Sequence, residues 1–322
     1  MKAIAKSRTA RGLLWVLSLI VLDLARGVAR ADDQALFVSQ RITPVNAFTR
    51  GIEGPAIDAA GNLFAVNLQP GGTIGKLEAG AAAPVLFATM PRGSKANGIR
   101  FGRAGEMYVA DYKGHNILVF AAGSQTPEVY FHSKAFHQPN DLAIAPDGTL
   151  YVSDPKFSGG GSGRIWKVTR AADGSGHGTM MTSDRAMGTT NGLDVSADGK
   201  TLYVGESTAS ELWAYDIDGG NLVNGRLLKK FMGGELDGLR LDADGRIFIT
   251  RNGQGKVAII AADGTLVREI STLGANPSNL TFGGSDGRTV FVTQVQGGFI
   301  EAFRSDRPGR EFCLGHLSPG CP

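Results

Sequence analysis

The sequence predicts an all-β protein, folded as a six-bladed β-propeller with four-stranded blades. One pattern of strands and turns recurs six times along the chain. Glycine accounts for 46 of the 322 residues, roughly double the ordinary share of about 7%, which indicates many tight turns. No long segment has the 3.6-residue period of an amphipathic helix.

Each copy of the repeat begins with a polar residue and continues as a strand, a turn and a second strand. In the third copy, apolar residues alternate with others in 142–144 and again in 150–152, on either side of the Pro-Asp-Gly turn at 146–148. This alternation around a tight turn is typical of a β-hairpin. The leading polar residues are 42 to 51 positions apart and are Glu53, Asn97, Asn140, Asn191, Asp237 and Asn279.

A third and a fourth short strand follow the hairpin. Third strands are expected at 115–120, 164–168, 211–215 and 256–260, and fourth strands at 127–131 and 227–231. Four antiparallel strands in a repeat of this length are the unit of a β-propeller, so six copies predict six blades.

The propeller is expected to span residues 32–310 as one domain. The last copy has room for about three strands before the tail, and the segment 36–42, upstream of the first copy, can supply the missing outer strand. Such a closure covers a strand edge that would otherwise be exposed. One domain is therefore favoured over two.

Residues 1–31 are expected to be a secretory signal peptide. Four basic residues precede an eleven-residue apolar stretch, 12–22, and Ala29-Arg30-Ala31 offers a small-residue cleavage site. Eleven helical residues rise about 16 Å, well short of a hydrocarbon core of about 30 Å. An uncleaved membrane anchor is the alternative, and Asp23 at the end of the apolar run counts against it. We expect an exported protein, periplasmic or secreted, with no membrane contact after cleavage.

The charge of the chain argues against a nucleic-acid partner. The formal net charge is +3, but the first 31 residues contribute +5, which leaves −2 for the remainder. A slightly acidic body without a basic stripe does not attract a phosphate backbone. The sequence carries no signature of an oligomeric state.

Both cysteines, Cys313 and Cys321, lie in a C-terminal tail, 311–322. In an oxidising compartment we expect them to form a disulfide that closes a small loop. The alternative is two unpaired thiols. Their spacing does not match a Cys-x-x-Cys zinc or redox motif.

The leading positions of the repeat form a candidate metal site. In a propeller the innermost strand of each blade faces the central channel, so equivalent residues form a ring. All six leading side chains bear oxygen, as two carboxylates and four amides. Without a cation, such a ring leaves like charges and buried polar groups unpaired. Oxygen donors without sulfur or imidazole suit Ca²⁺, Mg²⁺ or Mn²⁺ better than Zn²⁺. The alternative is local turn chemistry, in which each side chain bonds a nearby backbone amide.

Five short motifs carry a resemblance to a known family. They occur in order over residues 53–284 and are Glu53-Gly-Pro, Pro139-Asn-Asp-Leu, Asn191-Gly-Leu-Asp, Asp237-Gly and Ser278-Asn-Leu-Thr-Phe-Gly-Gly. The ordered set resembles the family of senescence marker protein (regucalcin), gluconolactonase and luciferin-regenerating enzyme, whose members are six-bladed propellers. Each motif is short, but their order over most of the chain is fairly specific.

The resemblance implies roles for four residues. Glu53, Asn191 and Asp237 match the three protein ligands of the family's divalent ion, which is usually Ca²⁺. Asn140 matches an asparagine near the ion that contacts the substrate. Asp237 also matches the carboxylate proposed as the general base.

Some positions fall outside that match. Asn97 and Asn279 complete the channel ring. They are expected to lie next to the ligands of the ion and to support them without binding the ion themselves.

Aldonolactone hydrolases of the family tend to carry Arg two positions before the substrate asparagine, where this chain has Gln138. The stretch 154–158 also offers no clear acidic partner for sugar hydroxyls. These departures concern a sugar-lactone substrate and leave the metal site intact.

The ring and the resemblance together predict a divalent-metal-dependent hydrolase of the lactonase type. Its partner would be a small lactone or related ester, opened by water after the metal polarises the carbonyl, with Asp237 taking the proton. Two alternatives stay open. One is a calcium-dependent phosphotriesterase-like hydrolase, and the other is a non-catalytic binding or scaffold propeller, in which Gln138 marks lost activity. A fold-level resemblance does not separate them, because propellers host many functions.

Overall fold

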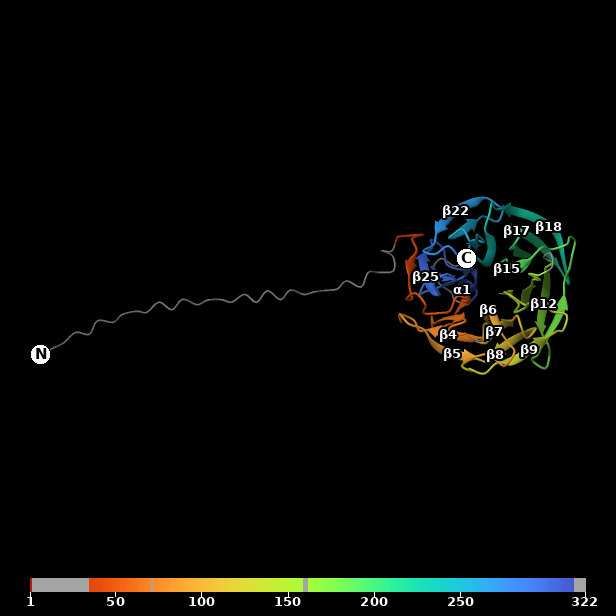
Figure 1. The fold of residues 1–322 in the computed structure, drawn as a ribbon. Helices are drawn as coiled ribbons and strands as arrows, with labels where there is room; N and C mark the ends of the chain where they lie inside the picture. The colour runs from red at the N-terminus through yellow and green to blue at the C-terminus, as the bar shows by residue number, and fades with distance from the viewer. Residues whose placement is uncertain (2–34, 71, 159–161, 316–322) are drawn as a thin grey trace. The chain divides into compact units, whose positions relative to one another are not determined.

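The repeat of the sequence reappears as a repeat of sheets. The computed structural model describes Met1 and residues 35–70, 72–158 and 162–315. Residues 35 onward belong to one unit, Ala35–Pro322, whose described part contains six sheets, one for each copy of the repeat. Figure 1 shows these sheets arranged around a common centre. The predicted all-β, six-bladed propeller is confirmed.

Within each of the first three blades, the strands follow chain order from the centre outward. Blade I comprises β2 (Glu53–Ile57), β3 (Leu63–Val66), β4 (Thr73–Leu77) and β5 (Val85–Thr89). Blade II comprises β6 (Ala96–Phe101), β7 (Met107–Asp111), β8 (Asn116–Phe120) and β9 (Glu128–His132). Blade III comprises β10 (Leu142–Ile144), β11 (Leu150–Asp154), β12 (Arg164–Arg170) and β13 (Gly176–Met180).

The other three blades follow the same plan with additions at two outer edges. Blade IV comprises β15 (Thr190–Val195), β16 (Thr201–Glu206), β17 (Glu211–Asp218) and β18 (Asn221–Lys230), with the two-residue β14 (Thr182–Ser183) parallel to β18. Blade V comprises β19 (Glu235–Leu241), β20 (Ile247–Asn252), β21 (Lys256–Ile260) and β22 (Leu266–Ser271). Blade VI comprises β23 (Pro277–Gly283), β24 (Thr289–Gln294), β25 (Phe299–Arg304) and β1 (Gln40–Arg41).

The outer strand of blade VI comes from the other end of the propeller sequence. Gln40 of β1 pairs with Ala302 of β25 in antiparallel register, and Leu36 forms a separate bridge with Arg304. The regular strand is shorter than the segment 36–42. Because blade VI combines residues from both ends of the repeat region, this pairing joins the two ends and covers the edge of β25.

The innermost strands contact one another in a closed ring, in the order β2, β6, β10, β15, β19, β23 and back to β2. In four of the six blades a glycine directly follows the leading residue, and it makes this close approach sterically feasible. A Cβ on Gly192 would lie 2.1 Å from the carbonyl oxygen of Asp237, and a Cβ on Gly54 would lie 1.9 Å from that of Asn97. Any other residue at these positions would push neighbouring blades apart.

A register shift marks the start of the innermost strand in five blades. In blade IV, Thr190 and Leu193 pair with Glu206 and Val204, so the inner strand contains one extra residue. Such a β-bulge bends the strand and re-aims the side chains beside it. Asn191 lies inside this bulge, so the bulge sets the direction of its side chain.

The apolar core lies between adjacent blades. In one cluster, Leu212 and Ala214 of blade IV pack with Leu239 and Ile249 of blade V, and all four are 2% exposed or less. Alternation along the strands therefore places apolar side chains against the next blade. This packing fixes the positions of the blades that carry the channel ring.

The helix α1 (Arg310–Gly315) lies near the centre of the propeller in Figure 1 and contacts β19 and β23. Gly309 bridges to Asp242, directly after the end of β19, whereas Asp237 lies near the start of that strand. The segment before Gly315 therefore covers the channel at the end away from the leading residues.

Some sequence predictions fall on residues that the structure does not describe. The predicted signal peptide, 1–31, lies outside the described residues apart from Met1. Cys313 lies in α1, but Cys321 is also outside them, so the disulfide stays a prediction. In the described ranges, none of the helices has the length and apolar content of a membrane span.

Candidate metal and active site

The leading residues of the repeat gather at one end of the channel. Five of them lie in the first half of the innermost strands, and Asn140 precedes β10 by two residues. Asn191 and Asn279 are 5% and 1% exposed, whereas four remain partly exposed, namely Glu53, Asn97, Asn140 and Asp237. This end of the channel is therefore open to a ligand.

Asp237 is held by amides from two strands. Asn191 Nδ2 donates to Asp237 Oδ1 at 2.9 Å, and Asn252 Nδ2 of β20 donates to Asp237 Oδ2 at 3.1 Å. Burial, and then the negative charge of Glu53, raise the pKa of Asp237 well above its ordinary value, against the opposing effect of the two amides. The two carboxylates of the ring, which lie in blades I and V, thus influence each other electrostatically.

Glu53 is held from its own blade and from blade VI. Its Oε2 accepts the Gly54 N–H at 2.8 Å and Asn279 Nδ2 at 3.0 Å. Burial, with a smaller contribution from the charge of Asp141, raises the pKa of Glu53 to about 7, although both hydrogen bonds act in the opposite direction. In the absence of a counterion, Glu53 therefore keeps its proton to a higher pH than an ordinary glutamate does.

The remaining ring amides differ in what they contact. Asn97 Nδ2 donates to the backbone carbonyl of Asn140 at 3.3 Å, and the Gly98 N–H donates to the same carbonyl at 2.8 Å. Asn97 therefore ties blade II to blade III. The side chain of Asn140 is partly exposed and makes no hydrogen bond to the described residues. Its amide is available to a ligand.

The residues present fit a hard divalent cation. Asn191 Oδ1 is buried and has no hydrogen-bond partner among the described residues, although the Nδ2 of the same amide is satisfied. The hydrogen-bond partners of Glu53 and Asp237 are a backbone N–H group and side-chain amides. Neither carboxylate forms an ion pair with a described Lys, Arg or His. Two carboxylates and an unpaired amide oxygen are donors that Ca²⁺ and Mg²⁺ prefer.

The set contains only two acidic side chains. Groups of three or more His, Cys, Asp or Glu side chains that could hold a metal do not occur among the described residues. The candidate site therefore depends on amide oxygens as well as carboxylates, a donor set that suits Ca²⁺ better than Zn²⁺.

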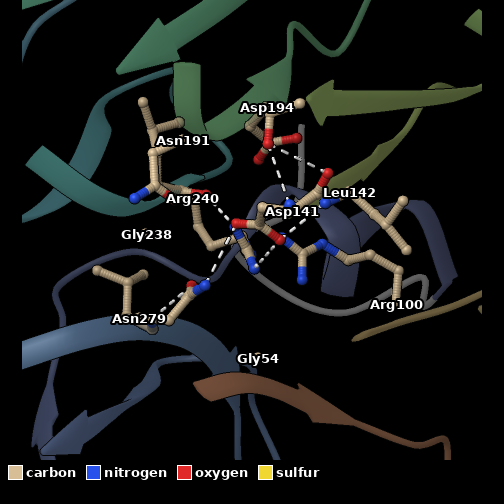
Figure 2. A network of polar contacts seen from close by, with 12 residues as sticks. Gly54, Arg100, Asp141, Leu142, Asn191, Asp194, Gly238, Arg240 and Asn279 are labelled. Atoms are coloured by element: carbon tan, nitrogen blue, oxygen red, sulfur yellow. Dashed lines mark hydrogen bonds and ion pairs between the residues drawn. The ribbon is translucent and has the colours of Figure 1, made fainter. Parts of the chain in front are cut away.

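A buried charge cluster lies beneath the ring (Figure 2). Asp141, fully buried, accepts Arg100 Nη2 at 3.0 Å and Arg240 Nη1 at 3.1 Å. Burial raises the pKa of Asp141 to about 6, although Arg100 lowers it. Asn279 Nδ2 also donates to Asp141 Oδ2, at 3.3 Å. The cluster therefore connects blades II, III, V and VI directly below the candidate site.

The sequence patterns did not predict this cluster, although the repeat contains a signal for it. Arg100, Asp194 and Arg240 each stand three positions after a leading residue, where a strand lining a core would be apolar. Simple alternation would place positions one and four of a strand on opposite faces. The extra residue of each bulge resets that alternation and turns these charges toward the channel.

The far end of the channel is closed by α1. Arg310 Nη2 contacts Asp194 Oδ1 at 2.6 Å, and Glu311 Oε1 lies 3.3 Å from Arg100 Nε. A small cavity lies between α1 and the cluster and is lined partly by Arg240. These ion pairs therefore hold the start of α1 against the far end of the channel.

In blade III, the sequence departs from the sugar-lactone pattern at Gln138 and near Asp154, and both side chains form hydrogen bonds within the protein. Asp154 is fully buried, and its Oδ1 accepts the backbone N–H groups of His137 and Gln138, both at 2.7 Å. Trp166 Nε1 donates to Oδ2 at 3.1 Å. Gln138 Oε1 accepts the Phe157 N–H at 3.2 Å. The Asp154 carboxylate and the side-chain carbonyl oxygen of Gln138 therefore already accept hydrogen bonds from the protein.

Comparisons with known proteins agree with this fold. Over 290 residues the chain is 26% identical to a gluconolactonase of Zymomonas mobilis subsp. mobilis, a match that covers 81% of each chain. The calcium-binding protein regucalcin of Agrobacterium tumefaciens has a similar structure, with a TM-score of 0.70, 18% identity and coverage of 84% of this chain and 97% of that one. A luciferin-regenerating enzyme gives a TM-score of 0.71 at the same identity and coverage. At such identities the structural matches show the fold alone.

The sequence profile of the family described as SMP-30/Gluconolactonase/LRE-like region matches residues 52–296. That range contains all six leading residues and most of the chain. The resemblance expected from the five motifs is therefore confirmed, and the chain belongs to the SMP-30/gluconolactonase/LRE-like family.

Proposed function

We propose that the chain is an exported hydrolase that opens a lactone or related ester with a divalent cation held by Glu53, Asn191 and Asp237. Family membership and the similarity to a gluconolactonase support a lactone-hydrolysing enzyme. The observation that carries the cation dependence is the buried, unpartnered Oδ1 of Asn191 beside two carboxylates that have no protein counterion among the described residues.

Ca²⁺ is the cation that we propose first, ahead of Mg²⁺, Mn²⁺ and Zn²⁺. All the donors are oxygens from carboxylate and amide side chains, which are typical Ca²⁺ ligands. A structural relative is itself described as a calcium-binding protein. The partial exposure of Glu53 and Asp237 would allow water or substrate to complete the coordination.

The bound cation would supply Lewis acidity, polarising an ester carbonyl and stabilising the oxyanion that develops there. Asp237 accepts the proton of the attacking water on a carboxylate oxygen, in an orientation maintained by Asn191 and Asn252. Asn140 donates its free side-chain amide to an oxygen of the substrate and so orients the ring to be opened. Asn279 holds Glu53 in place throughout.

The polar groups of blade III favour a lactone with few hydroxyls over a sugar lactone. Asp154 has no exposed surface and both of its oxygens accept protein N–H groups, so it does not bind a sugar hydroxyl. Gln138 supplies no positive charge, and its carbonyl oxygen is engaged by Phe157. The specificity would then depend mainly on the cation site and on Asn140.

The test is a substrate panel with purified mature protein, combined with metal analysis and a chelator. The panel contains alkyl lactones, sugar lactones, linear esters and phosphotriesters. We expect lactone turnover that chelation abolishes and Ca²⁺ restores. Turnover of phosphotriesters alone would favour the phosphotriesterase-like alternative. A stoichiometric ion without turnover of any ester would support a binding protein and contradict the proposed function.

Export is tested separately. Removal of residues 1–31 predicts a mature protein that begins at Asp32. Cell fractionation followed by N-terminal sequencing should find this species outside the cytoplasm. Recovery of the full-length chain from the cytoplasmic fraction alone would contradict export.

A further inference from the structure

We propose that Asp141 is a positioning residue for the cation site and acts on Glu53 through the side-chain amide of Asn279. The inference rests on the proposed function, because Glu53 is one of the proposed cation ligands. Asp141 itself lies one residue beyond Asn140 and points below the ring, into the cluster of Figure 2.

Asn279 links the two carboxylates. Its Nδ2 donates to Glu53 Oε2 at 3.0 Å and to Asp141 Oδ2 at 3.3 Å, and the side chain is 1% exposed. Its Oδ1 accepts the Leu280 N–H at 2.9 Å. A flip of the amide would break all three contacts and turn its oxygen toward two carboxylates, so the orientation of Asn279 is determined. That orientation fixes the side of Glu53 that remains available to a cation.

Asp141 is itself fixed by contacts from three directions. Its Oδ1 accepts the Leu142 N–H at 2.8 Å and Arg100 Nη2 at 3.0 Å, and its Oδ2 lies 3.1 Å from Arg240 Nη1. Arg100 belongs to blade II and Arg240 to blade V, so the position of Asp141 depends on the assembled propeller. It therefore provides Asn279 with a rigid acceptor.

Asp141 also shields the site from positive charge. Arg100 and Arg240 are 2% and 1% exposed and share Asp141 as an ion-pair partner, and Arg100 also lies 3.3 Å from Glu311 Oε1. With Asp141 and Glu311 ionised, the charges of these four side chains sum to zero. Neutralising Asp141 leaves Arg240 without a carboxylate partner among the described residues and adds one net positive charge below a site that must accept a dication. Loss of positioning and loss of shielding both weaken cation binding.

The experiment measures Ca²⁺ affinity by calorimetry for the full chain and three variants. Asp141→Asn keeps the shape and removes the charge. Asn279→Ala removes the link to Glu53 but leaves both ion pairs of Asp141 in place. The matched control is Asp194→Asn, which breaks another buried ion pair, with Arg310, and touches no ring side chain.

We expect D141N and N279A to weaken Ca²⁺ binding by about 10- to 100-fold, as for other residues that orient metal ligands. The double variant should be less impaired than the product of the two single effects, because both act on one link. D194N should bind Ca²⁺ within about twofold of the unmodified protein, although it is also destabilised.

The outcomes separate the two proposals. If the unmodified protein binds no divalent cation, the proposed function fails and this inference fails with it. If the unmodified protein binds Ca²⁺ and D141N binds it equally well, only the inference is overturned. Undiminished affinity in N279A overturns it as well, whether or not D141N is recovered in folded form, and so does an equal loss in D194N.

Discussion

Asn191 donates its side-chain N–H to Asp237 of the neighbouring blade at 2.9 Å, while the oxygen of the same amide is buried without a hydrogen-bond partner among the described residues. A buried polar atom left unsatisfied costs about 1–3 kcal/mol. Asp237 is also desolvated, and the charge of Glu53 acts on it. A cation coordinated by these oxygens would relieve both costs, so removal of the cation or of its ligands should have measurable effects.

Replacing Asp237 should abolish lactone turnover. Asp237→Asn keeps the shape but removes the charge and the proton acceptor, and we expect kcat/KM to fall by about 10²- to 10⁴-fold. Asp237→Ala should be at least as impaired. The control is Asp244→Asn in the hairpin turn of the same blade, whose carboxylate contacts Arg307 on the surface. A full rate in D237N would refute the assignment of this residue.

Binding of the cation should stabilise the fold. A ligand at 100 times its Kd stabilises the native state by about 2.7 kcal/mol. Thermal denaturation in excess Ca²⁺, compared with a chelated sample, measures this shift in Tm. Glu53→Gln, which removes one ligand charge, should lose most of the shift, whereas D244N should retain it. An equal shift in E53Q would exclude Glu53 as a ligand.

Stability of the cation-free protein should decrease as the pH rises through the range in which Glu53 ionises. Glu53 has a pKa of about 7 in the fold and 4.5 as its ordinary value, so between these values the native state keeps a proton that the unfolded chain has lost. The effect is complete above pH 7 and amounts to at most about 3 kcal/mol. Denaturation with chelator at pH 4.5 to 8 measures it.

The matched comparison is E53Q, whose neutral side chain cannot titrate. The difference in unfolding free energy between E53Q and the unmodified protein should grow with pH over this range in favour of E53Q. A difference that does not change with pH would show that Glu53 has no raised pKa in the cation-free fold.

Substituting the glycine after a leading residue should disturb both the fold and the site. A Cβ at Gly192 would lie 2.1 Å from the Asp237 carbonyl oxygen and 2.5 Å from the Leu239 nitrogen, both of which belong to the backbone. We expect Gly192→Ala to cost about 1–3 kcal/mol in urea denaturation, because blade V must move away from Asn191.

Gly220→Ala is the control, because a Cβ at Gly220 would meet no atom within 4 Å. It should change the free energy of unfolding by less than about 0.5 kcal/mol. Equal stability of the two variants would contradict the tight packing of neighbouring inner strands.

Much of the architecture could be predicted from the spacing of the repeat. The expected third strand at 256–260 coincides with β21 (Lys256–Ile260), while the one at 211–215 extends further as β17 (Glu211–Asp218). Strand ends depend on the pairing partner: β17 is prolonged because it continues into a long hairpin with β18. Within 211–215, the sequence does not indicate that the strand continues beyond residue 215.

The ring could be predicted as a set, but the different contacts of its members could not. Asn97 and Asn279 occupy equivalent repeat positions. One donates to the backbone of Asn140, while the other joins Glu53 to Asp141. The partners of Asn279 lie 226 and 138 residues away in the chain. Only closure of the six blades brings them within hydrogen-bond distance.

By itself, the sequence determined the number of blades, the family and the polar character of six channel positions, because spacing and residue type are local properties that each copy carries. Tertiary structure alone decided which oxygens face one another and that Asp141 lies between Arg100 and Arg240. The physical reason is the bulge near the start of five inner strands. One added residue turns every later side chain of the strand to the opposite face of the sheet. The resulting contacts form between blades that are distant in the chain.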